Sequence, residues 1–565
     1  MNKQFASKRQ AACTCVAASF ILSLLHVAIT SSVSAEQASD HGLLEITGTK
    51  SPYLVQFLVP GSDFLSIHGL TFDAKDNLYV GSVMGQAIYQ IDVEAGESSV
   101  FIGPPQGMAD DLEFGPDGTV VWTSILSGTV HARRPNGDIF VVAKDLPGAN
   151  AVAFHPDGRL FVTQVLWGDA LWELDLNGKK APRKVREGMG HLNGFDFDRD
   201  GYLYGPLIYK GMVVRIDVDS GEMKTLASGF AIPVAVNLDS QDNIYVVDGR
   251  LGRLVRVDRN TGEQTLVATL ETGIDNLAIN SKDEVFTTNL VDNAIHKINT
   301  RTGAYRTLMR SELSVPGGLD VVTDKGVDTI YLGDLFTYST IDGDTGNVIE
   351  VKRGLEQHVE LPMSVYAEGD KVVTAGWFAD AVEIFDRQSG ASIASYHNLI
   401  DPVDAILLGD GRVLVAEHGT GNLVAINAKD TERQILASGL SGMAALRPAS
   451  GEEVYVSVIE PGQLLRINLL SGEKAVVVNG LNQPEGFDVM SDGTVVLAEV
   501  GKRRVISIDP KSGSVSEIAR NLAIGYPAAK SSPPVFITTG VGVSENGAIY
   551  VSSDVNTAIY KITKQ

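Results

Sequence analysis

The chain has 565 residues, of which 69 are Asp or Glu and 46 are Lys or Arg, so its formal charge is −23. An acidic surface of this kind repels nucleic acid and anionic lipid and favours cations, so neither nucleic acid nor an anionic membrane is expected as a partner. The length exceeds what one hydrophobic core organises, so two domains are expected.

Residues 1–35 have the pattern of a removed signal peptide: basic residues precede an apolar run over 11–30, and small residues end it at 33–35. An uncleaved membrane anchor is the alternative, since the run is long enough to span a bilayer. Removal would also remove three positive charges, so the formal charge of the mature chain would be −26 instead of −23. It would also remove Cys13 and Cys15, the two cysteines of the chain, so the mature protein is expected without thiols, periplasmic or secreted.

The sequence repeats itself with a step of 40 to 43 residues. The first six copies begin "IHGLTF", "ADDLEF", "ANAVAF", "LNGFDF", "PVAVNL" and "IDNLAI", and six more follow near positions 316, 362, 402, 441, 484 and 538. Each copy alternates apolar and polar residues, turns at a DG, DN or NG pair, and continues with three more short strands. Four antiparallel strands per copy are typical of a propeller blade, so the fold class is all-β, with two tandem six-bladed propellers.

The ends of the repeats predict how the rings close. The last copy stops after its third strand, and a spare strand, "YLVQFLV", precedes the first copy. If each propeller begins with a fourth strand, residues 53–59 close the first ring and "AYRTLM" closes the second. The domains would then be 36–301 and 302–565.

The stretch "FDFDRDG" at 195–201 has the spacing of the first part of a calcium loop. An EF-hand loop would require a glutamate where Leu207 stands, and the helices are missing. The sister copies place "GPDG" and "HPDG" here, so we interpret the aspartates of 196–201 as part of the tight turn between first and second strands.

The first strand of every blade lines the central channel, so six equivalent positions should meet at its mouth. In the first propeller these positions hold, in order, His68, Asp110, Asn150, Asn193, Val234 and Asp275. Carboxylate and amide oxygens suit a hard cation, and Asp110, Asn150, Asn193 and Asp275 are therefore predicted to bind Ca²⁺ or another divalent cation. The alternative is a water-filled channel whose polar rim hydrogen-bonds to itself.

The motifs at this mouth resemble two known families. "LNGFDFDRDGYLY" resembles a strand of the senescence-marker protein and gluconolactonase family, and "IDNLAI" and "ADDLEF" are similar to segments of paraoxonases. The resemblance implies a six-bladed propeller that holds Ca²⁺ in its channel and hydrolyses lactones or phosphotriesters, with Asn150 and Asn193 as the amide ligands. His68 and Val234 stand where that family places Glu and Asp, so the site would have been rebuilt.

These features predict an exported metal-dependent hydrolase of the lactonase or esterase type, acting on a small molecule. His68 is the first candidate base, and His191, on the loop that enters the same mouth, is the second. A bound cation would polarise the carbonyl that is attacked. Trp167 and Trp172 are candidates for a pocket wall, although core packing is the expected role of at least one of them.

The second propeller carries a different pattern. "VLVAEHGTGNLVAIN" resembles the blades of streptogramin lyases, metal-dependent propellers, so a lyase site built from Glu417, His418 and Glu485 is an alternative. An acidic, solvated rim explains the same residues without chemistry. A propeller that binds a protein or glycan and catalyses nothing is the third hypothesis.

Overall fold

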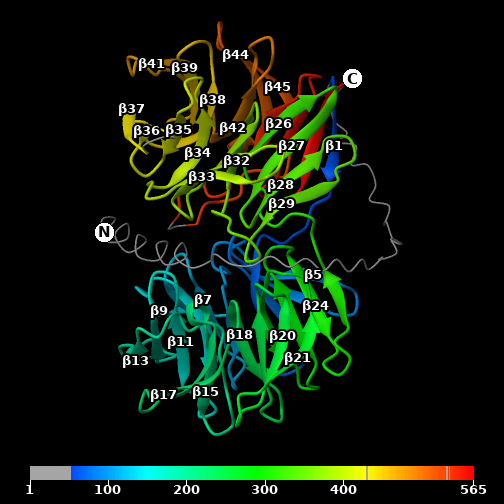
Figure 1. Ribbon diagram of the computed structural model, residues 1–565, viewed down its shortest axis with the longest axis vertical. Coiled ribbons are helices and arrows are strands. Elements are labelled where there is room, and N and C mark those ends of the chain that lie inside the picture. The colour runs from blue at the N-terminus through cyan, green and yellow to red at the C-terminus, as the bar shows by residue number, and fades with distance from the viewer. Residues whose placement is uncertain (1–51, 428–430, 530–531, 534) are drawn as a thin grey trace.

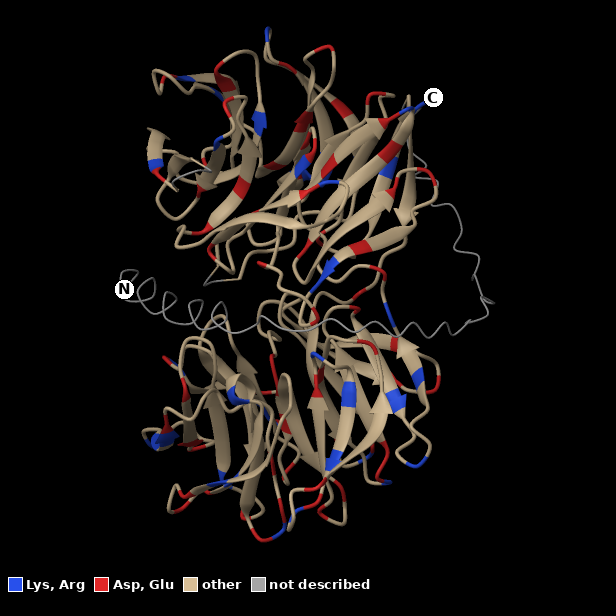
Figure 2. Ribbon diagram, in the orientation of Figure 1, with Lys and Arg blue, Asp and Glu red and all other residues tan. Residues whose placement is uncertain are grey.

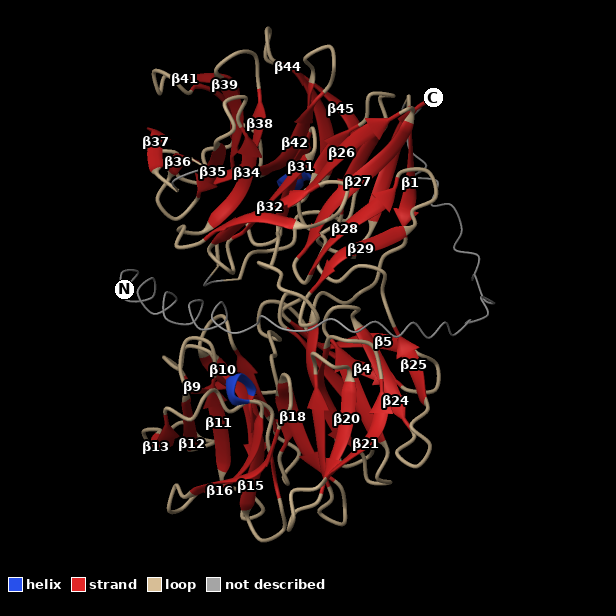
Figure 3. Ribbon diagram, in the orientation of Figure 1, coloured by secondary structure: helices blue, strands red, loops and turns tan. Residues whose placement is uncertain are grey.

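The computed structural model describes residues 52–427, 431–529, 532–533 and 535–565. It consists of twelve four-stranded antiparallel sheets and two short 3-10 helices, η1 (Ile208–Lys210) and η2 (Val500–Lys502). Figure 3 shows how completely strands and loops dominate it. The expected segment 1–35 lies outside the described residues. No helix among the described residues is long and apolar enough to cross a membrane.

Six sheets form the N-terminal propeller, and each contains four consecutive strands. The first three are β2–β5 (Ile67–Phe72, Leu78–Ser82, Ala87–Asp92, Glu97–Ile102), β6–β9 (Leu112–Phe114, Val120–Ser124, Thr129–Arg133, Ile139–Ala143) and β10–β13 (Ala149–Phe154, Leu160–Gln164, Ala170–Leu174, Arg183–Glu187). The others are β14–β17 (Asp196–Phe197, Tyr202–Leu207, Met212–Asp217, Met223–Ser228), β18–β21 (Pro233–Leu238, Ile244–Asp248, Arg253–Val257, Gln264–Thr269) and β22–β25 (Ile274–Ile279, Val285–Asn289, Ala294–Ile298, Tyr305–Met309). Because β22 packs against β2, the ring is closed.

The C-terminal propeller repeats this plan. Its first three sheets are β26–β29 (Leu319–Asp324, Val327–Asp334, Thr337–Asp342, Val348–Arg353), β30–β33 (Ser364–Glu368, Lys371–Gly376, Ala381–Asp386, Ser392–Tyr396) and β34–β37 (Pro402–Leu407, Val413–Glu417, Asn422–Ile426, Arg433–Ala437). The others are β38–β41 (Met443–Pro448, Glu453–Val458, Gln463–Asn468, Lys474–Asn479), β42–β45 (Pro484–Val489, Val495–Glu499, Arg504–Asp509, Ser514–Arg520) and β46–β48 (Val541–Val543, Ile549–Ser552, Ile559–Lys564) with β1 (Tyr53–Val59).

The expected closure of the rings was wrong. Strand β1 pairs with β48 and completes the last sheet of the C-terminal propeller, where Figure 1 shows it in blue beside the red C-terminal strands. The strand expected to close the second ring, β25, pairs with β24 and completes the N-terminal ring. The six N-terminal sheets therefore end at Met309 and not at the expected boundary near Arg301. Strand β48 pairs with β47 on one side only, and β1 covers its other edge.

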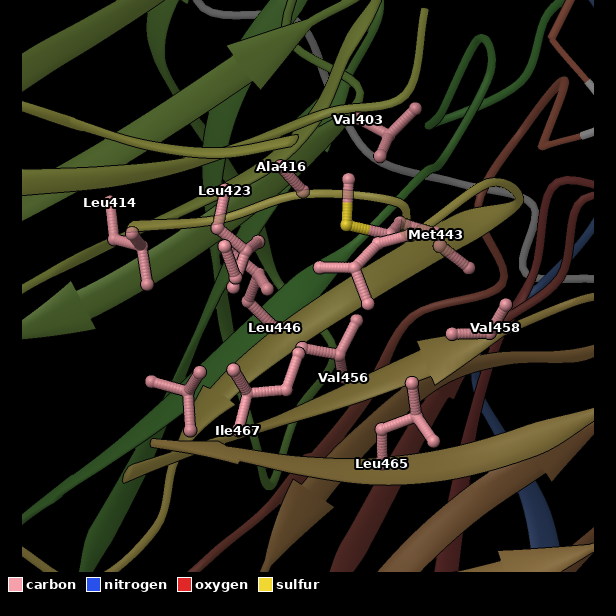
Figure 4. Close-up of a cluster of buried hydrophobic side chains, with 14 of the residues drawn as sticks. Val403, Leu414, Ala416, Leu423, Met443, Leu446, Val456, Val458, Leu465 and Ile467 are labelled. Atoms are coloured by element: carbon pink, nitrogen blue, oxygen red, sulfur yellow. The ribbon is translucent and has the colours of Figure 1, made fainter. Parts of the chain in front are cut away.

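Apolar side chains between neighbouring sheets hold each ring together. Figure 4 shows one such cluster, in which residues of β34–β37 and β38–β41 point toward one another. Leu414, Leu446 and Val456 in this cluster are fully buried. The second strands of the blades are buried along their whole length, because neighbouring blades cover both of their faces.

The two propellers face each other through their mouths (Figure 1). One buried cluster joins loops of both, including Met84, Met108 and Val165 from the first and Trp377 and Phe536 from the second. At the edge of this junction Arg353 donates to both carboxylate oxygens of Asp292, at 2.9 and 2.6 Å. Residues 110, 150 and 275 therefore lie beneath the junction rather than on an open face.

Candidate functional site

Four of the predicted mouth residues do converge. His68 Nδ1 lies 2.9 Å from Asp275 Oδ2 and 3.8 Å from Asp110 Oδ1. The amide of Asn150 donates to the other oxygen of Asp110. We call these four residues the mouth cluster. They come from the first strands of three blades and from the loop before β6, which explains why residues about 40 or 200 positions apart can meet.

Burial and mutual charge shape the mouth cluster. Burial raises the pKa of Asp110 to about 7, and the charge of Asp275 adds to that effect while His68 opposes it. Burial by itself would lower the pKa of His68, but the hydrogen bond and charge of Asp275, together with Asp110, outweigh it and raise that pKa above its ordinary value. The cluster thus holds a carboxyl whose pKa is about 7 beside an imidazole whose pKa is raised above its ordinary value.

The other two predicted residues stay apart from the cluster. The backbone of Asn193 donates to Pro206, and no contact of its side chain with the mouth cluster is seen among the described residues. His191 packs edge-on against Tyr209, with ring centroids 4.7 Å apart, and its Nδ1 is buried without a partner. Burial lowers the pKa of His191, and Asp169 partly opposes this.

The mouth cluster is not arranged as a metal cage. In the described part of the chain, no group of three or more His, Cys, Asp or Glu side chains is placed to hold a metal ion. The oxygens of Asp110 and Asp275 are engaged by His68 and by the amide of Asn150. In this arrangement the four residues of the mouth cluster pair with one another, and whether they bind a cation stays a prediction.

A polar cavity of about 210 Å³ lies below the mouth cluster, in the central channel. Three carboxylates and two amides line it: Asp111, Glu113, Asp196, Asn237 and Asn276. Asn276 donates to Asp111 at 3.2 Å across the blade between them. This contact requires the glycine of that blade, because a Cβ on Gly69 would lie 2.6 Å from Oδ1 of Asp111.

Asp196 corrects one sequence interpretation. Asp198 and Asp200 do form the expected turn, in which Asp198 Oδ1 accepts from the backbone of Asp200 at 3.0 Å and of Tyr202 at 2.8 Å. Asp196 does not belong to that turn but begins β14 and lines the cavity. Burial raises its pKa to about 6.

The cavity carboxylates also tie blades together. Asp111 accepts from the backbone N–H of Val152 at 3.0 Å, and Glu113 accepts from that of Phe154 at 2.6 Å, in each case on the first strand of the next blade. Burial raises the pKa of Asp111 to about 7 and that of Glu113 well above its ordinary value. These two carboxylates therefore hold neighbouring blades together as well as lining the cavity. The spacing of the repeats did not reveal this role.

The C-terminal channel contains the same kind of hydrogen bonds between neighbouring blades, together with a buried arginine. Asp320, Asp404 and Asp488 each accept a backbone N–H from the following blade. Arg447, 5% exposed, extends among them and donates to Asp404 Oδ2 at 3.2 Å. Its guanidinium also donates to the carbonyls of Leu446 and Leu319. Arg447 therefore partly neutralises the charge of this channel.

The three residues of the alternative lyase site have separate partners in the structure. Glu417 accepts from Ile400 N and Thr420 Oγ1, His418 Nδ1 lies 3.0 Å from the carbonyl of Met443, and Glu485 accepts from Thr539 N at 2.7 Å. Within the described residues, no contact joins these three side chains. Each carboxylate holds the backbone of a loop in place.

The two tryptophans have different surroundings. Trp172 donates to Gln164 at 2.7 Å and packs in the sheet of β10–β13. Trp167 lies at the junction, 5.9 Å from the ring of Phe378 of the C-terminal propeller. Only Trp167 is thus placed near the mouth, as part of a wall that both propellers build.

Comparisons with known proteins bear on the fold of this chain and do not assign its activity. Residues 113–266 match the family model described as "Outer membrane protein assembly factor BamB", about a quarter of the chain. No curated protein matches the sequence.

Several solved structures are similar in shape. The Niastella koreensis GH74 enzyme is 13% identical, with 88% of this chain and 91% of that chain covered and a TM-score of 0.43. The extracellular domain of a putative one-component system from B. thetaiotaomicron is 11% identical, with 89% and 76% covered and a TM-score of 0.32. A catalytically inactive virginiamycin B lyase from Staphylococcus aureus, crystallised with quinupristin, is 13% identical, with 57% and 96% covered and a TM-score of 0.24. None of these likenesses assigns an activity to this chain.

Proposed function

We propose that this protein is an exported hydrolase that cleaves a small lactone or ester at the mouth of the N-terminal propeller. The observation that carries the proposal is the contact of His68 Nδ1 with Asp275 at 2.9 Å, beside a second carboxyl, Asp110. A histidine held by a carboxylate through one ring nitrogen presents the other nitrogen as a base. The resemblance to gluconolactonases and paraoxonases supports the same substrate class.

The residues of the mouth cluster divide the acid and base roles. Asp275 fixes the His68 tautomer with hydrogen on Nδ1, so Nε2 can remove a proton from the attacking nucleophile. Asp110, whose pKa is about 7, is partly protonated at neutral pH and can donate a hydrogen bond to the leaving oxygen, which takes its proton from His68. Asn150 holds Asp110 in place by its amide donation.

A product analysis tests the proposal. The purified protein is incubated with a panel of lactones and esters in H₂¹⁸O, with Glu417→Gln as a control in the other propeller. We expect one ¹⁸O atom in the acid product of the wild type and of the control, and a large loss of rate in Asp275→Asn. A new double bond in the product would instead establish a lyase, and binding without turnover would establish a binding module.

Calcium dependence and export remain predictions of the sequence. Calorimetry with CaCl₂ on the wild type and on Asn193→Ala tests the first, and heat of binding that disappears in the variant would show that the mouth residues rearrange around a cation. Sequencing the N-terminus of the protein recovered outside the cytoplasm tests the second. A start at Glu36 would confirm removal of residues 1–35.

A further inference from the structure

A serine hydroxyl completes the contacts of His68. Ser66 Oγ lies 2.7 Å from His68 Nε2, and Asp275 Oδ2 lies 2.9 Å from His68 Nδ1. The three side chains therefore form a line of hydrogen bonds from hydroxyl to imidazole to carboxylate. The tautomer with hydrogen on Nδ1 lets Nε2 accept the serine proton, which is the arrangement that activates a serine for attack.

The backbone at Ser66 is unusual for a serine. Its φ is +55°, in the left-handed region, and its carbonyl accepts the N–H of Val83 after the second strand of the blade. Gly148 and Gly273 occupy the same position in two other blades, where they make the same backbone hydrogen bond with positive φ. His191, Asp401 and Gln483 make the same hydrogen bond at positive φ in further blades, so the position accepts side chains, and at residue 66 that side chain is a hydroxyl that meets His68.

We propose that Ser66 is the nucleophile of the hydrolysis and that His68 and Asp275 activate it. This inference rests on the proposed function and deepens it, because it predicts a covalent acyl-enzyme. Ser66 Oγ bonds to the carbonyl carbon of the ester while its proton passes to His68 Nε2. The C–O bond to the leaving alcohol then breaks, and the alcohol takes that proton. Water attacks the acyl-serine, gives a proton to Nε2, and Ser66 recovers a proton as the acid departs.

Ser66 lies beside the junction between the propellers. Ser66 is fully buried, whereas the side chains of His68 and Asp275 are each 16% exposed. The ring of Phe336, from the loop between β27 and β28, lies 6.3 Å from the His68 ring at an interplanar angle of 66°. The C-terminal propeller thus supplies an aromatic cover, and a substrate must displace it to reach the hydroxyl.

A fluorophosphonate probe, which phosphonylates activated serines, tests the proposal without knowledge of the substrate. We expect one adduct per chain, mapped to Ser66 by peptide mass, and its loss in Ser66→Ala. Asp275→Asn should slow labelling at least about tenfold, and Phe336→Ala should speed it. Ser457→Ala, which removes a buried serine hydroxyl of the C-terminal propeller, is the matched control and should label as the wild type does. Ser66→Cys, alkylated and mapped in the same way, serves if the alanine variant does not fold.

The outcomes separate this inference from the proposed function. If the wild type hydrolyses esters, takes up no probe at Ser66 and keeps its rate within twofold in Ser66→Ala, water is the nucleophile; the inference is then wrong and the proposed function stands. If the wild type neither hydrolyses the panel nor reacts with the probe, both are overturned. An adduct at Ser66 with an initial burst of alcohol release from an ester supports both.

Discussion

The two propellers share one blade plan but treat the charge in their channels differently. In the N-terminal channel Asp111, Glu113 and Asp196 surround a cavity of about 210 Å³ whose lining includes no Lys or Arg. In the C-terminal channel three aspartates hold the same kind of interblade hydrogen bonds, and Arg447 fills the space among them. Figure 2 shows that acidic residues are spread over both halves, so overall charge does not distinguish the propellers.

This difference separates a channel whose carboxyls share an arginine from one whose carboxyls line a cavity without Lys or Arg. A buried arginine that donates to carboxylates and carbonyls fixes its surroundings. Burial raises the pKa of carboxyls in both channels, to about 7 for Asp111 and for Asp320, but only in the C-terminal channel does an arginine oppose that rise. The mouth cluster lies above the second kind of channel, which is where acid and base chemistry can operate.

The largest expected effect concerns the arginine itself. Replacing Arg447 with Met leaves Asp404, Asp320 and Asp488 without their cation, so the free energy of unfolding should fall by about 3–5 kcal/mol. Urea denaturation followed by tryptophan fluorescence measures this. Arg466→Met, at a partly exposed arginine of the same sheet, should change stability by less than about 1 kcal/mol. Equal effects in the two variants would show that the buried cation does not hold this channel together.

Asp275 should matter for activity rather than for the fold of its channel. Asp275→Asn removes the charge that raises the pKa of His68, so kcat should fall by about 10²–10⁴-fold. The pKa of His68, followed by NMR, should fall as well. In the wild type, activity should rise with pH as His68 loses its proton, with a midpoint above 6.5, and should fall again as Asp110, whose pKa is about 7, ionises. A variant with unchanged kcat and a lowered histidine pKa would place the chemistry elsewhere.

A smaller effect is expected from Glu113. Its pKa is raised in the folded state, so the folded protein holds a proton that the unfolded chain loses above about pH 4.3. Stability is therefore lost as pH rises from that value toward the folded pKa. Glu113→Gln keeps an oxygen to accept from Phe154 and removes this proton, so stability near pH 8 should increase by about 1 kcal/mol. Glu94→Gln, at an exposed position, should leave the pH dependence of unfolding unchanged.

The smallest effect should come from the C-terminal rim. Glu417→Gln keeps an acceptor for Ile400 N, so activity on any ester should remain within about twofold of the wild type. A much larger loss would mean that the C-terminal propeller takes part in the chemistry, and it would favour the lyase hypothesis for Glu417, His418 and Glu485.

Most of the fold and part of the candidate site could be predicted from the sequence. The repeat step identified the blades, and the position of the repeat brought His68, Asp110, Asn150 and Asp275 to one mouth. Ser66 was missed because its contact with His68 is made from a left-handed backbone just before β2, which the alternation of the strand does not reveal. The interblade role of Asp111 and Glu113 was missed because it depends on backbone N–H groups, which a sequence does not distinguish.

The amino-acid sequence by itself determined the all-β class, the twelve blades and the ring of first strands, because alternation with a period of two and a step of about 40 residues leave few other folds. Only the tertiary structure decided which edge β1 covers, that the two mouths face each other, and that Phe336 covers His68. These contacts join residues hundreds of positions apart, and they depend on which edge and which apolar surface each propeller leaves uncovered. That information belongs to the folded shape and not to any local pattern.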